Sequence, residues 1–375
     1  MKQKNKLLII VFLLIIFVPP LFTGVYLKYS KNNENRSLAE FPIFEETGIK
    51  KFPSSFEEWW NDHLPFKNEL TTFNSYIRVK LLNTTSNRTV ILGKGEWLFY
   101  NNYTADDNPI NDILGYNMYT KEQMDKIADN ISIANETLKE KDIEFYVFIP
   151  PNKETIYKDY LPNYLIEESV DKTSTEILYE YLISKNLNVL YPKQELLEAS
   201  ENFQTYYTYD THWNKLGGYV GFSALCKKLQ IDLPPISNKN IMDATTYPVI
   251  DLANLLAMEK MVEQELEKTV KIEGMDKQLV DKKIYDSGEE AYFTTPFPEH
   301  PNPPHDKTVL IIHDSYYKSM IEYFPLVFTK TIAVHRDYAN LCSTQEMIEK
   351  YNPNIVILEV VERGSKILLH ENMPY

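Results

Sequence analysis

One short segment of the sequence places an acid two residues before a histidine. Asp210 and His212 lie within residues 209–214, at the start of a predicted helix over 214–229. An aspartate that meets one imidazole nitrogen fixes the tautomer of the ring and leaves the other nitrogen to act as a base. The alternative interpretation is that Asp210 caps the helix and His212 packs beside Trp213. The pattern by itself leaves both interpretations open.

A second segment joins an apolar run to a serine. Residues 308–312 predict a buried strand, and Ser315 follows at the expected start of a helix. The N–H groups and the dipole of a helix N-terminus favour a developing oxyanion, so Ser315 is a candidate nucleophile. Asp314 and Ser315 could also serve only as N-caps, which is their commoner use. A base and its orienting acid elsewhere in the chain favour the nucleophile.

The elements around these segments predict an α/β fold. Strands and helices alternate along most of the chain, which is typical of a mostly parallel sheet with helices on both faces. Strands are expected at 143–149, 188–191, 308–312, 330–334 and 354–361, and helices at 120–140, 172–185, 214–229, from 316 onward and at 343–350. In such sheets ligands bind beyond the carboxyl ends of the strands, where Ser315 and Asn152 are expected.

Two further stretches depart from this alternation. Residues 89–100 predict a β-hairpin around a glycine-containing loop. Residues 233–306 predict an insertion or lid, with a charged helix near 253–272 and a proline-rich stretch at 296–304.

The N-terminal residues predict a membrane anchor. Residues 1–6 carry three lysines and precede the uncharged run 7–27, whose length suits a bilayer core of about 30 Å at about 1.5 Å rise per residue. The positive-inside rule puts residues 1–6 in the cytoplasm, so a single-pass protein of the cell membrane with an extracytoplasmic domain is expected. Cleavage of the segment as a signal peptide, with secretion of the rest, is the alternative.

The remaining chain divides into two predicted parts. Aromatic clusters in residues 28–86 predict a short amphipathic helix packed on the main domain, which is expected to span residues 87–375. The formal net charge of -14 has the wrong sign for binding phosphate backbones, so nucleic acid is not an expected partner. Having only two cysteines, Cys226 and Cys342, excludes thiolate-rich zinc sites, and neither is expected to be structurally essential.

Several motifs together resemble one known family. The motifs are Glu34-Asn35-Arg36-Ser37-Leu38-Ala39, Asp62-His63-Leu64-Pro65-Phe66, Gly93-Lys94-Gly95-Glu96-Trp97-Leu98-Phe99, Ile149-Pro150-Pro151-Asn152-Lys153 with Tyr157, Asp210-Thr211-His212-Trp213-Asn214 and Asp314-Ser315. They resemble the SGNH-hydrolase-like domain of the alginate O-acetyltransferase family, AlgJ and AlgX, and its DHHW-type relatives. The Asp/His block precedes the serine block, as in the AlgX-like branch. The resemblance implies an SGNH-hydrolase-like, flavodoxin-like sheet with a circularly permuted order of motifs.

The resemblance also assigns roles to three residues: Ser315 as nucleophile, His212 as general base and Asp210 as the acid that orients it. It implies an O-acetyltransferase or acetylesterase of the SGNH type that forms an acetyl-serine on the way to modifying a cell-surface polysaccharide, without a cofactor. By the same analogy, a membrane-bound O-acyltransferase supplies the acetyl group. The alternative function is a catalytically inactive protein that binds glycan or assists the assembly of surface polysaccharide.

Additional side chains are candidates for substrate binding or for an oxyanion hole: Asn152, Tyr157, His313 and Arg363. His313 replaces the glycine that commonly precedes the Asp-Ser pair in the family, and Arg363 follows the last predicted strand. A metal site is a weaker alternative, because no pair of its ligands has the spacing of known zinc motifs. Its ligands would be His212, Asp210, His313 and His335.

Overall fold

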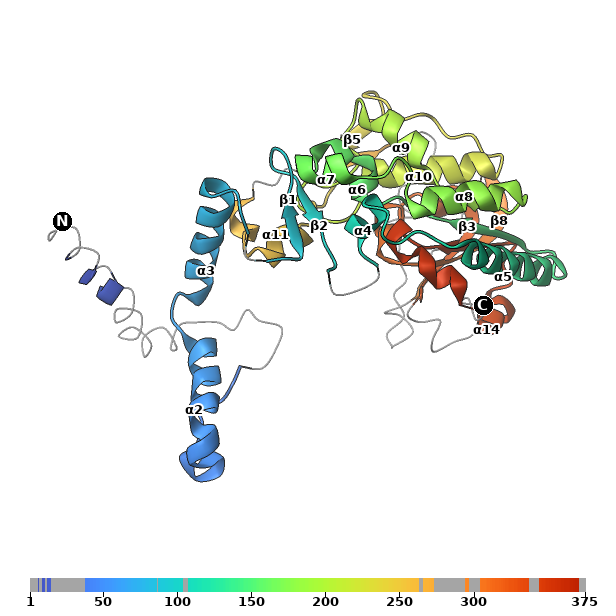
Figure 1. Ribbon diagram of the computed structural model, residues 1–375. Helices are drawn as coiled ribbons and strands as arrows, with labels where there is room; N and C mark the ends of the chain where they lie inside the picture. The colour runs from blue at the N-terminus through green and yellow to red at the C-terminus, as the bar shows by residue number, and fades with distance from the viewer. Residues whose placement is uncertain are drawn as a thin grey trace. The chain divides into compact units, whose positions relative to one another are not determined.

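The computed structural model describes most of the chain. The described residues are 6, 9–10, 12–14, 38–85, 87–103, 107–262, 266–272, 294–296, 304–336 and 344–370. They belong to two compact units, Met1–Leu82 and Asn83–Tyr375 (Figure 1). The finer division of the chain at residues 6, 27 and 86 stays a prediction.

The predicted membrane span lies mostly outside the described residues. Its described members are helical and exposed: Ile9, Ile10, Phe12, Leu13 and Leu14. Within the described part of the chain, no helix combines the length and the apolar character needed to cross a membrane. The membrane anchor therefore stays a prediction.

The first unit is helical. It contains α2 (Phe44–His63), α3 (Lys67–Tyr76) and a π-helical turn, η1 (Ile77–Leu81). Phe41 packs edge-on against Trp59, with the ring centroids 4.9 Å apart. Most of the aromatic cluster thus lies on a helix, as its spacing predicts, and this helix has a kink at Gly48, where φ is 64°. Its packing on the main domain stays a prediction.

A six-stranded sheet forms the centre of the second unit. The strand order is β4-β3-β10-β8-β9-β7, and all neighbours are parallel except β7 and β9. The strands are β3 (Glu144–Phe148), β4 (Val189–Leu190), β7 (Thr294–Pro296), β8 (His305–His313), β9 (Phe328–His335) and β10 (Ile355–Glu359). The prediction of a mostly parallel sheet is confirmed, and the five predicted strands are the five parallel ones.

Helices cover both faces of this sheet, because the strand side chains alternate between two apolar cores. Phe145 and Val147 face one core, with side chains of α5 (Lys121–Lys139), α8 (Ser174–Ser184) and α14 (Thr344–Tyr351). Tyr146 and Phe148 face the other core, with α9 (Lys193–Ser200) and α10 (Lys215–Lys228) (Figure 1). Parallel strands that are buried on both faces explain the continuous apolar runs in the sequence.

Shorter elements surround the sheet. The predicted hairpin is confirmed as the antiparallel pair β1 (Val90–Leu92) and β2 (Leu98–Tyr100). The short helices are α4 (Pro109–Ile113), α6 (Lys153–Ile156), η2 (Lys158–Tyr160), α7 (Asn163–Glu168) and η7 (Glu362–Leu369).

The predicted charged helix near 253–272 is wrong. The region contains α11 (Asp251–Leu255), the 3-10 helix η3 (Glu259–Met261) and an antiparallel pair, β5 (Ile241–Asp243) with β6 (Lys268–Val270). Ala257 has a φ of 52°, which a continuing α-helix does not allow. Most of the proline-rich stretch, residues 297–303, lies outside the described residues.

The predicted α-helix after Ser315 is also wrong. Two 3-10 helices, η4 (Ser315–Ser319) and η5 (Phe324–Leu326), connect β8 to β9 instead. Consecutive aromatic side chains, Tyr316 with Tyr317 and Tyr323 with Phe324, are all buried here. The burial of all four side chains indicates that tertiary packing, rather than local helical patterning, determines the path of this segment.

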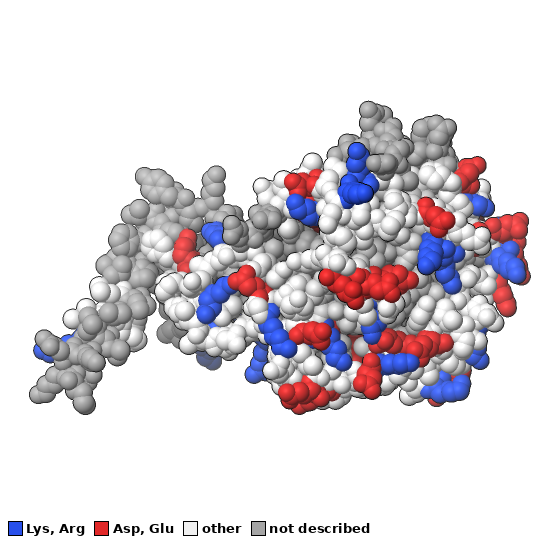
Figure 2. All heavy atoms as spheres, turned by 90° about the horizontal axis from the view of Figure 1, so that it is seen from above, with Lys and Arg blue, Asp and Glu red and all other residues white. Residues whose placement is uncertain are grey.

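The net charge predicts that nucleic acid is not a partner, and neither cysteine is predicted to be structurally essential. The structure describes the charges on one face and one of the two cysteines. Figure 2 shows acidic and basic side chains interspersed on the face that it displays. Cys226 is a free, fully buried cysteine within α10. Cys342 lies outside the described residues.

Candidate active site

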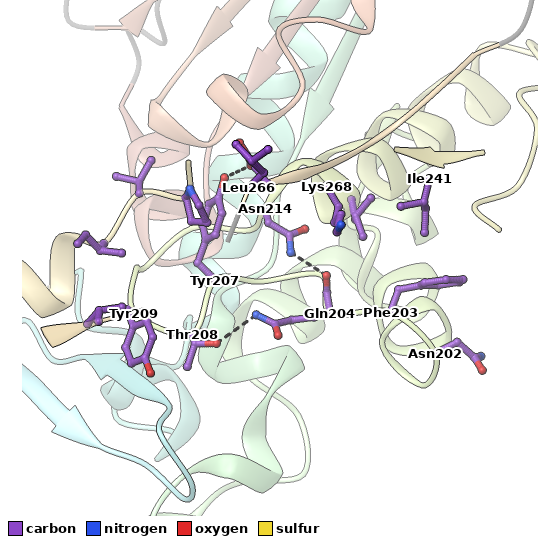
Figure 3. A pocket seen from close by; sticks show the side chains of 16 residues that line it. Asn202, Phe203, Gln204, Tyr207, Thr208, Tyr209, Asn214, Ile241, Leu266 and Lys268 are labelled. Atoms are coloured by element: carbon purple, nitrogen blue, oxygen red, sulfur yellow. Dashed lines mark hydrogen bonds between the residues drawn. The ribbon is translucent and has the colours of Figure 1, made fainter. Parts of the chain in front are cut away.

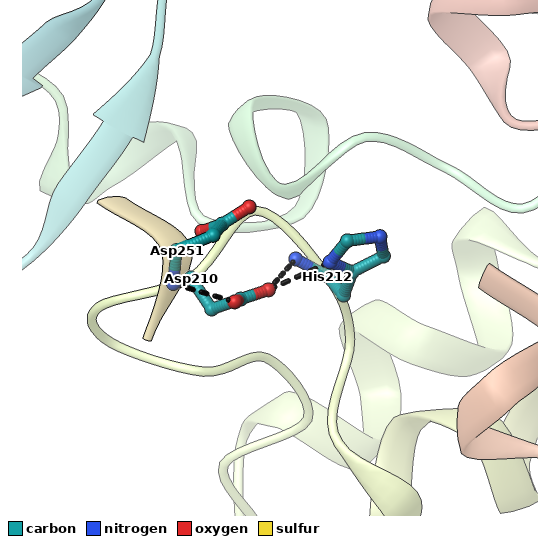
Figure 4. Close-up of side chains that lie close together, drawn as sticks. All are labelled: Asp210, His212 and Asp251. Carbon is teal, nitrogen blue, oxygen red and sulfur yellow. Dashed lines mark hydrogen bonds and ion pairs between the residues drawn. The ribbon is translucent and has the colours of Figure 1, made fainter. Parts of the chain in front are cut away.

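The segment between residues 207 and 214, which we call the base loop, holds Asp210 against His212. One oxygen of the buried Asp210 carboxylate lies 2.7 Å from His212 Nδ1 and accepts a hydrogen bond from His212 N at 2.9 Å (Figure 4). The helix cap is a different residue, because the Asn214 side chain accepts from Gly217 N at 3.0 Å. Asp210 therefore orients the imidazole ring and does not cap α10.

A second carboxylate supports the base loop. Asp251, at the start of α11, donates its backbone N–H to the other Asp210 oxygen at 2.9 Å. The Asp251 carboxylate accepts hydrogen bonds from Thr211 N at 2.9 Å and from Thr211 Oγ1 at 2.8 Å. The two acids therefore hold neighbouring backbone N–H groups: Asp210 accepts from His212 N, and Asp251 accepts from Thr211 N.

These contacts push the pKa values of the two acids apart. Burial acts to raise the pKa of Asp210, but the hydrogen bond and the charge interaction with His212 lower it to about 2. Burial and the nearby charge of Asp210 raise the pKa of Asp251 to about 6. Asp210 is therefore the carboxylate that favours its charged form beside the imidazole ring.

Residues 313–316, which we call the nucleophile turn, bring Ser315 to the other side of the imidazole. Ser315 Oγ lies 2.8 Å from His212 Nε2. The Asp314 carboxylate accepts from Tyr316 N at 2.9 Å and from Val361 N at 2.8 Å, which fixes the turn to the end of β10. The sequence-based argument from a helix dipole does not apply, because η4 is a five-residue 3-10 helix. The hydrogen bonds of Asp314 instead hold the turn that carries Ser315 in place.

A cavity of about 300 Å³ opens at the contact between Ser315 and His212. Its lining residues are Tyr100, Asp107, Thr211, His212, Asp251, Asp314, Ser315, Arg336, Val361, Arg363 and Gly364. The sequence-based reasoning missed Asp251, Arg336, Tyr100 and Asp107. Arg336 directly follows β9, so the rule that ligands bind beyond strand ends offered a signal for it. We find no local signal for the other three.

The four additional candidate residues lie at different depths. Arg363 lines the cavity, and its Nη1 donates to Tyr316 Oη at 3.2 Å and to Asn152 Oδ1 at 3.3 Å. Asn152 is fully buried behind Arg363 and does not line the cavity. Tyr157 is buried too, with its ring stacked on Trp97 at 4.3 Å. Of these residues, Arg363 is placed to meet a substrate.

His313 does not line the cavity either. It is buried, its Nδ1 lies 2.7 Å from the carbonyl oxygen of Asp314, and its ring lies 4.3 Å from that of Tyr317. Burial lowers the pKa of His313 to about 4, so the ring is neutral at neutral pH. The expectation of a second imidazole in the oxyanion hole does not match this position.

The metal alternative keeps two of its expected residues, Asp210 and His212, and adds Asp251. Among the described residues, Asp210, His212 and Asp251 each place one ligand atom within 4.8 Å of the others (Figure 4). His313 and His335 do not join this group. Asp210 Oδ1 and His212 Nδ1 face each other at hydrogen-bond distance, so each already has a partner.

A second cavity, of about 470 Å³, shares the base loop as a wall (Figure 3). Tyr207, Thr208, Tyr209 and Asn214 line it, whereas Thr211 and His212 line the cavity at Ser315. The base loop therefore separates an aromatic and amide-rich hollow from the candidate catalytic centre.

Comparison with known proteins identifies the class. Residues 90–291, more than half of the chain, match the family model described as ALGX, the SGNH hydrolase-like domain of acetyltransferase AlgX. The chain belongs to this family. The resemblance noted in the sequence and the prediction of an SGNH-type enzyme are thereby confirmed. The match ends before Ser315, so it does not test the nucleophile.

The chain also matches several solved bacterial structures, three of which follow. PatB1 from Bacillus cereus has 14% sequence identity over 76% of this chain and 100% of its own, with a TM-score of 0.48. A DHHW family protein from Eubacterium siraeum has 15% identity over 67% and 90%, with a TM-score of 0.46. The O-acetyltransferase domain of Pseudomonas putida AlgJ has 14% identity over 76% and 94%, with a TM-score of 0.44. No curated protein matches the chain.

Proposed function

We propose that this protein is an extracytoplasmic polysaccharide O-acetyltransferase, or acetylesterase, that uses Ser315, His212 and Asp210 as a catalytic triad. The observation that carries the proposal is the unbroken chain of contacts from Asp210 to His212 at 2.7 Å and from His212 to Ser315 at 2.8 Å. Nucleophile, base and orienting acid in this geometry are what acyl transfer requires.

The proposed reaction is a double displacement. His212 Nε2 takes the proton of Ser315 as Oγ attacks the carbonyl carbon of the acetyl donor. The tetrahedral intermediate collapses, the bond to the donor oxygen breaks, and His212 returns the proton to the leaving group. A hydroxyl group of the acceptor then loses its proton to His212 and attacks the acetyl-serine. Collapse releases the acetylated acceptor, and His212 returns the proton to Ser315.

Asp210 acts through the imidazole in both halves of the reaction. Its low pKa keeps the carboxylate charged, so it stabilises the imidazolium that forms each time His212 takes a proton. Arg336 and Arg363 line the same cavity and are proposed to bind the substrate there. Water as acceptor would make the enzyme an esterase, and a sugar hydroxyl would make it a transferase.

The donor and the location belong to the same proposal. A membrane-bound O-acyltransferase is proposed as the source of the acetyl group, and residues 7–27 as the anchor that holds the domain outside the cytoplasm. The three lysines before an uncharged run support the anchor. Fractionation of the full-length chain tests it: the protein should stay with the membrane after alkaline extraction, and release into the soluble fraction would contradict the anchor.

Ester turnover tests the enzyme. The full-length protein is incubated with p-nitrophenyl acetate, and the acetylated residue is identified by mass spectrometry. We expect turnover and an acetyl group on Ser315, with both lost in Ser315→Ala. Ser184→Ala is the matched control, because the Ser184 hydroxyl donates only to Tyr181 O at the exposed end of α8. Equal turnover in Ser315→Ala would exclude the proposed nucleophile, and no turnover in folded wild type would favour the glycan-binding alternative.

A further inference from the structure

Lys153 lies fully buried beneath the base loop, at the start of α6, five residues after the last residue of β3. Its ammonium group donates to three backbone carbonyl oxygens, those of Leu98 at 2.6 Å, Thr208 at 3.0 Å and Asp210 at 2.9 Å. An ammonium group has three N–H donors, so each has one acceptor. Lys153 thereby joins strand β2 to two positions in the base loop.

The surroundings of Lys153 suit a buried cation. Its Nζ lies 5.1 Å from the centroid of the Trp97 ring and 5.2 Å from that of Phe99, and aromatic faces attract positive charge. Burial lowers the pKa of Lys153, while neighbouring carboxylates act in the opposite direction. Three carbonyl acceptors also favour the charged form over a neutral amine, which has only two N–H donors.

The residues on either side of Lys153 reach other walls of the catalytic cavity. Asn152 Oδ1 accepts from Arg363 Nη1 at 3.3 Å, and Glu154 Oε1 accepts from Tyr100 N at 2.9 Å. Tyr100 and Arg363 both line the cavity, whereas the three buried residues do not. The buried segment 152–154 therefore contacts three parts of the site: Arg363, Tyr100 and the base loop.

We propose that Lys153 is a positioning residue for acyl transfer, whose ammonium group holds the backbone of Asp210 so that the Asp210 carboxylate meets His212 while Nε2 meets Ser315. The inference rests on the proposed function. Without this group the base loop keeps the backbone hydrogen bond from Leu98 N to Thr208 O at 3.0 Å but loses the one from Lys153 to Asp210 O, so the peptide that carries the Asp210 carboxylate can shift. The contacts of 2.7 Å and 2.8 Å then no longer coincide. A misplacement of about 1 Å reduces the rate of such a reaction by about 10²-fold.

The first test separates turnover from binding. Lys153→Met keeps the length of the side chain and removes its donors and charge. We expect kcat for p-nitrophenyl acetate to fall by about 10²-fold, with KM within about twofold of wild type, because Lys153 does not line the cavity. Lys158→Met is the matched control, since Lys158 donates to Val170 O at 3.1 Å away from the site. The control should keep wild-type kinetics.

The second test asks whether Lys153 acts through Asp210. If it does, combining Lys153→Met with Asp210→Asn should give a variant about as slow as Asp210→Asn alone. Losses that multiply would overturn the inference and indicate a purely structural lysine, as would a wild-type kcat in Lys153→Met. If circular dichroism shows that Lys153→Met does not fold, Lys153→Gln, which keeps one amide donor group, is measured by the same two criteria.

The same assay separates this inference from the proposed function. Loss of turnover in Ser315→Ala together with full turnover in a folded Lys153→Met would overturn only the positioning role. Full turnover in Ser315→Ala would overturn the proposed function, and the positioning role with it.

Discussion

The base loop and the nucleophile turn meet at the contact between His212 and Ser315, yet different interactions hold them. In the base loop, charged groups predominate: Asp210 faces the imidazole, and the ammonium group of Lys153 lies beneath it. Asp251 adds a second carboxylate at hydrogen-bond distance from Thr211. This half of the site surrounds the imidazole ring of His212, the group that is proposed to take and return a proton.

The nucleophile turn depends on backbone hydrogen bonds. Asp314 accepts from two backbone N–H groups, those of Tyr316 and Val361, and its own N–H donates to Glu359 Oε2 at 2.8 Å. Burial, together with the charge of Asp314, raises the pKa of Glu359 well above its ordinary value, which favours the uncharged form of this carboxyl group. The shift thus disfavours a second negative charge beside the serine.

The difference suggests a division of labour within the site. Charged groups surround His212, whereas hydrogen bonds to backbone N–H groups hold the turn that carries Ser315. Substitutions that remove charge from the base loop should therefore affect the rate more than the stability. Substitutions in the nucleophile turn should affect both.

The largest effect is expected from Asp210→Asn. The amide cannot stabilise the imidazolium and favours the wrong tautomer of His212, so ester turnover should fall by about 10³- to 10⁴-fold with the fold intact. Turnover and melting temperature are measured together. Asn214→Ala is the control, because loss of this helix cap should cost about 1 kcal/mol of stability and leave most of the activity. Retention of most activity in Asp210→Asn would contradict the charge-based account of the base loop.

A smaller effect on rate, but a clear effect on stability, is expected from Asp314→Asn. Asparagine offers one acceptor oxygen where Asp314 uses two, so a backbone N–H of Tyr316 or Val361 loses its partner. The free energy of unfolding should fall by about 1 to 3 kcal/mol, measured by urea denaturation. Turnover should fall by about 10- to 10²-fold through displacement of Ser315. Unchanged stability would show that the turn is held by other contacts.

Asp251→Asn tests the charge beside the base loop through pH. The folded protein keeps a proton on Asp251 up to about pH 6, whereas the unfolded chain releases it near pH 4, so wild-type stability falls as pH rises through this window. The variant lacks this titration. Relative to wild type, it should therefore gain about 1 to 2 kcal/mol of unfolding free energy between about pH 4 and pH 7. Parallel stability profiles of the two proteins would show that Asp251 has an ordinary pKa.

The smallest effect is expected from Glu359→Gln. An amide resembles the neutral carboxyl group in shape and can still accept from Asp314 N, so unfolding free energy should change by less than about 1 kcal/mol. Glu359→Ala is the matched comparison and should cost about 1 to 3 kcal/mol, because it leaves that buried N–H unpaired. If Glu359→Gln lowers the unfolding free energy as much as Glu359→Ala does, Glu359 is charged in the wild type. The contrast between the base loop and the nucleophile turn would then no longer hold.

Much of the fold was predictable because its determinants are local. Residues 143–149 and 354–361 are apolar runs that a parallel sheet buried on both faces requires, and both contain strands. The hairpin at residues 89–100 was equally clear. The helix after Ser315 was not, since four buried aromatic side chains decide the path of that segment.

The site was predictable in part. Asp210, His212 and Ser315 were singled out by residue type and by their positions at element boundaries, and the structure brings them into contact, although their catalytic roles remain a proposal. Asp251 and Lys153 were missed as members of the site. Asp251 lies 41 positions from Asp210 in the sequence, in a stretch whose pattern predicted a different element.

The sequence by itself determined the strands, the alternation of layers, the family and the three candidate catalytic residues, because periodicity and motifs act over a few neighbouring positions. Only the tertiary structure decided that Ser315 Oγ and His212 Nε2, from residues 103 positions apart, lie 2.8 Å from each other, and that the Lys153 ammonium group binds the loop that carries His212. Hydrogen bonds of this kind depend on where the sheet brings separate strand ends together. No local pattern encodes that placement.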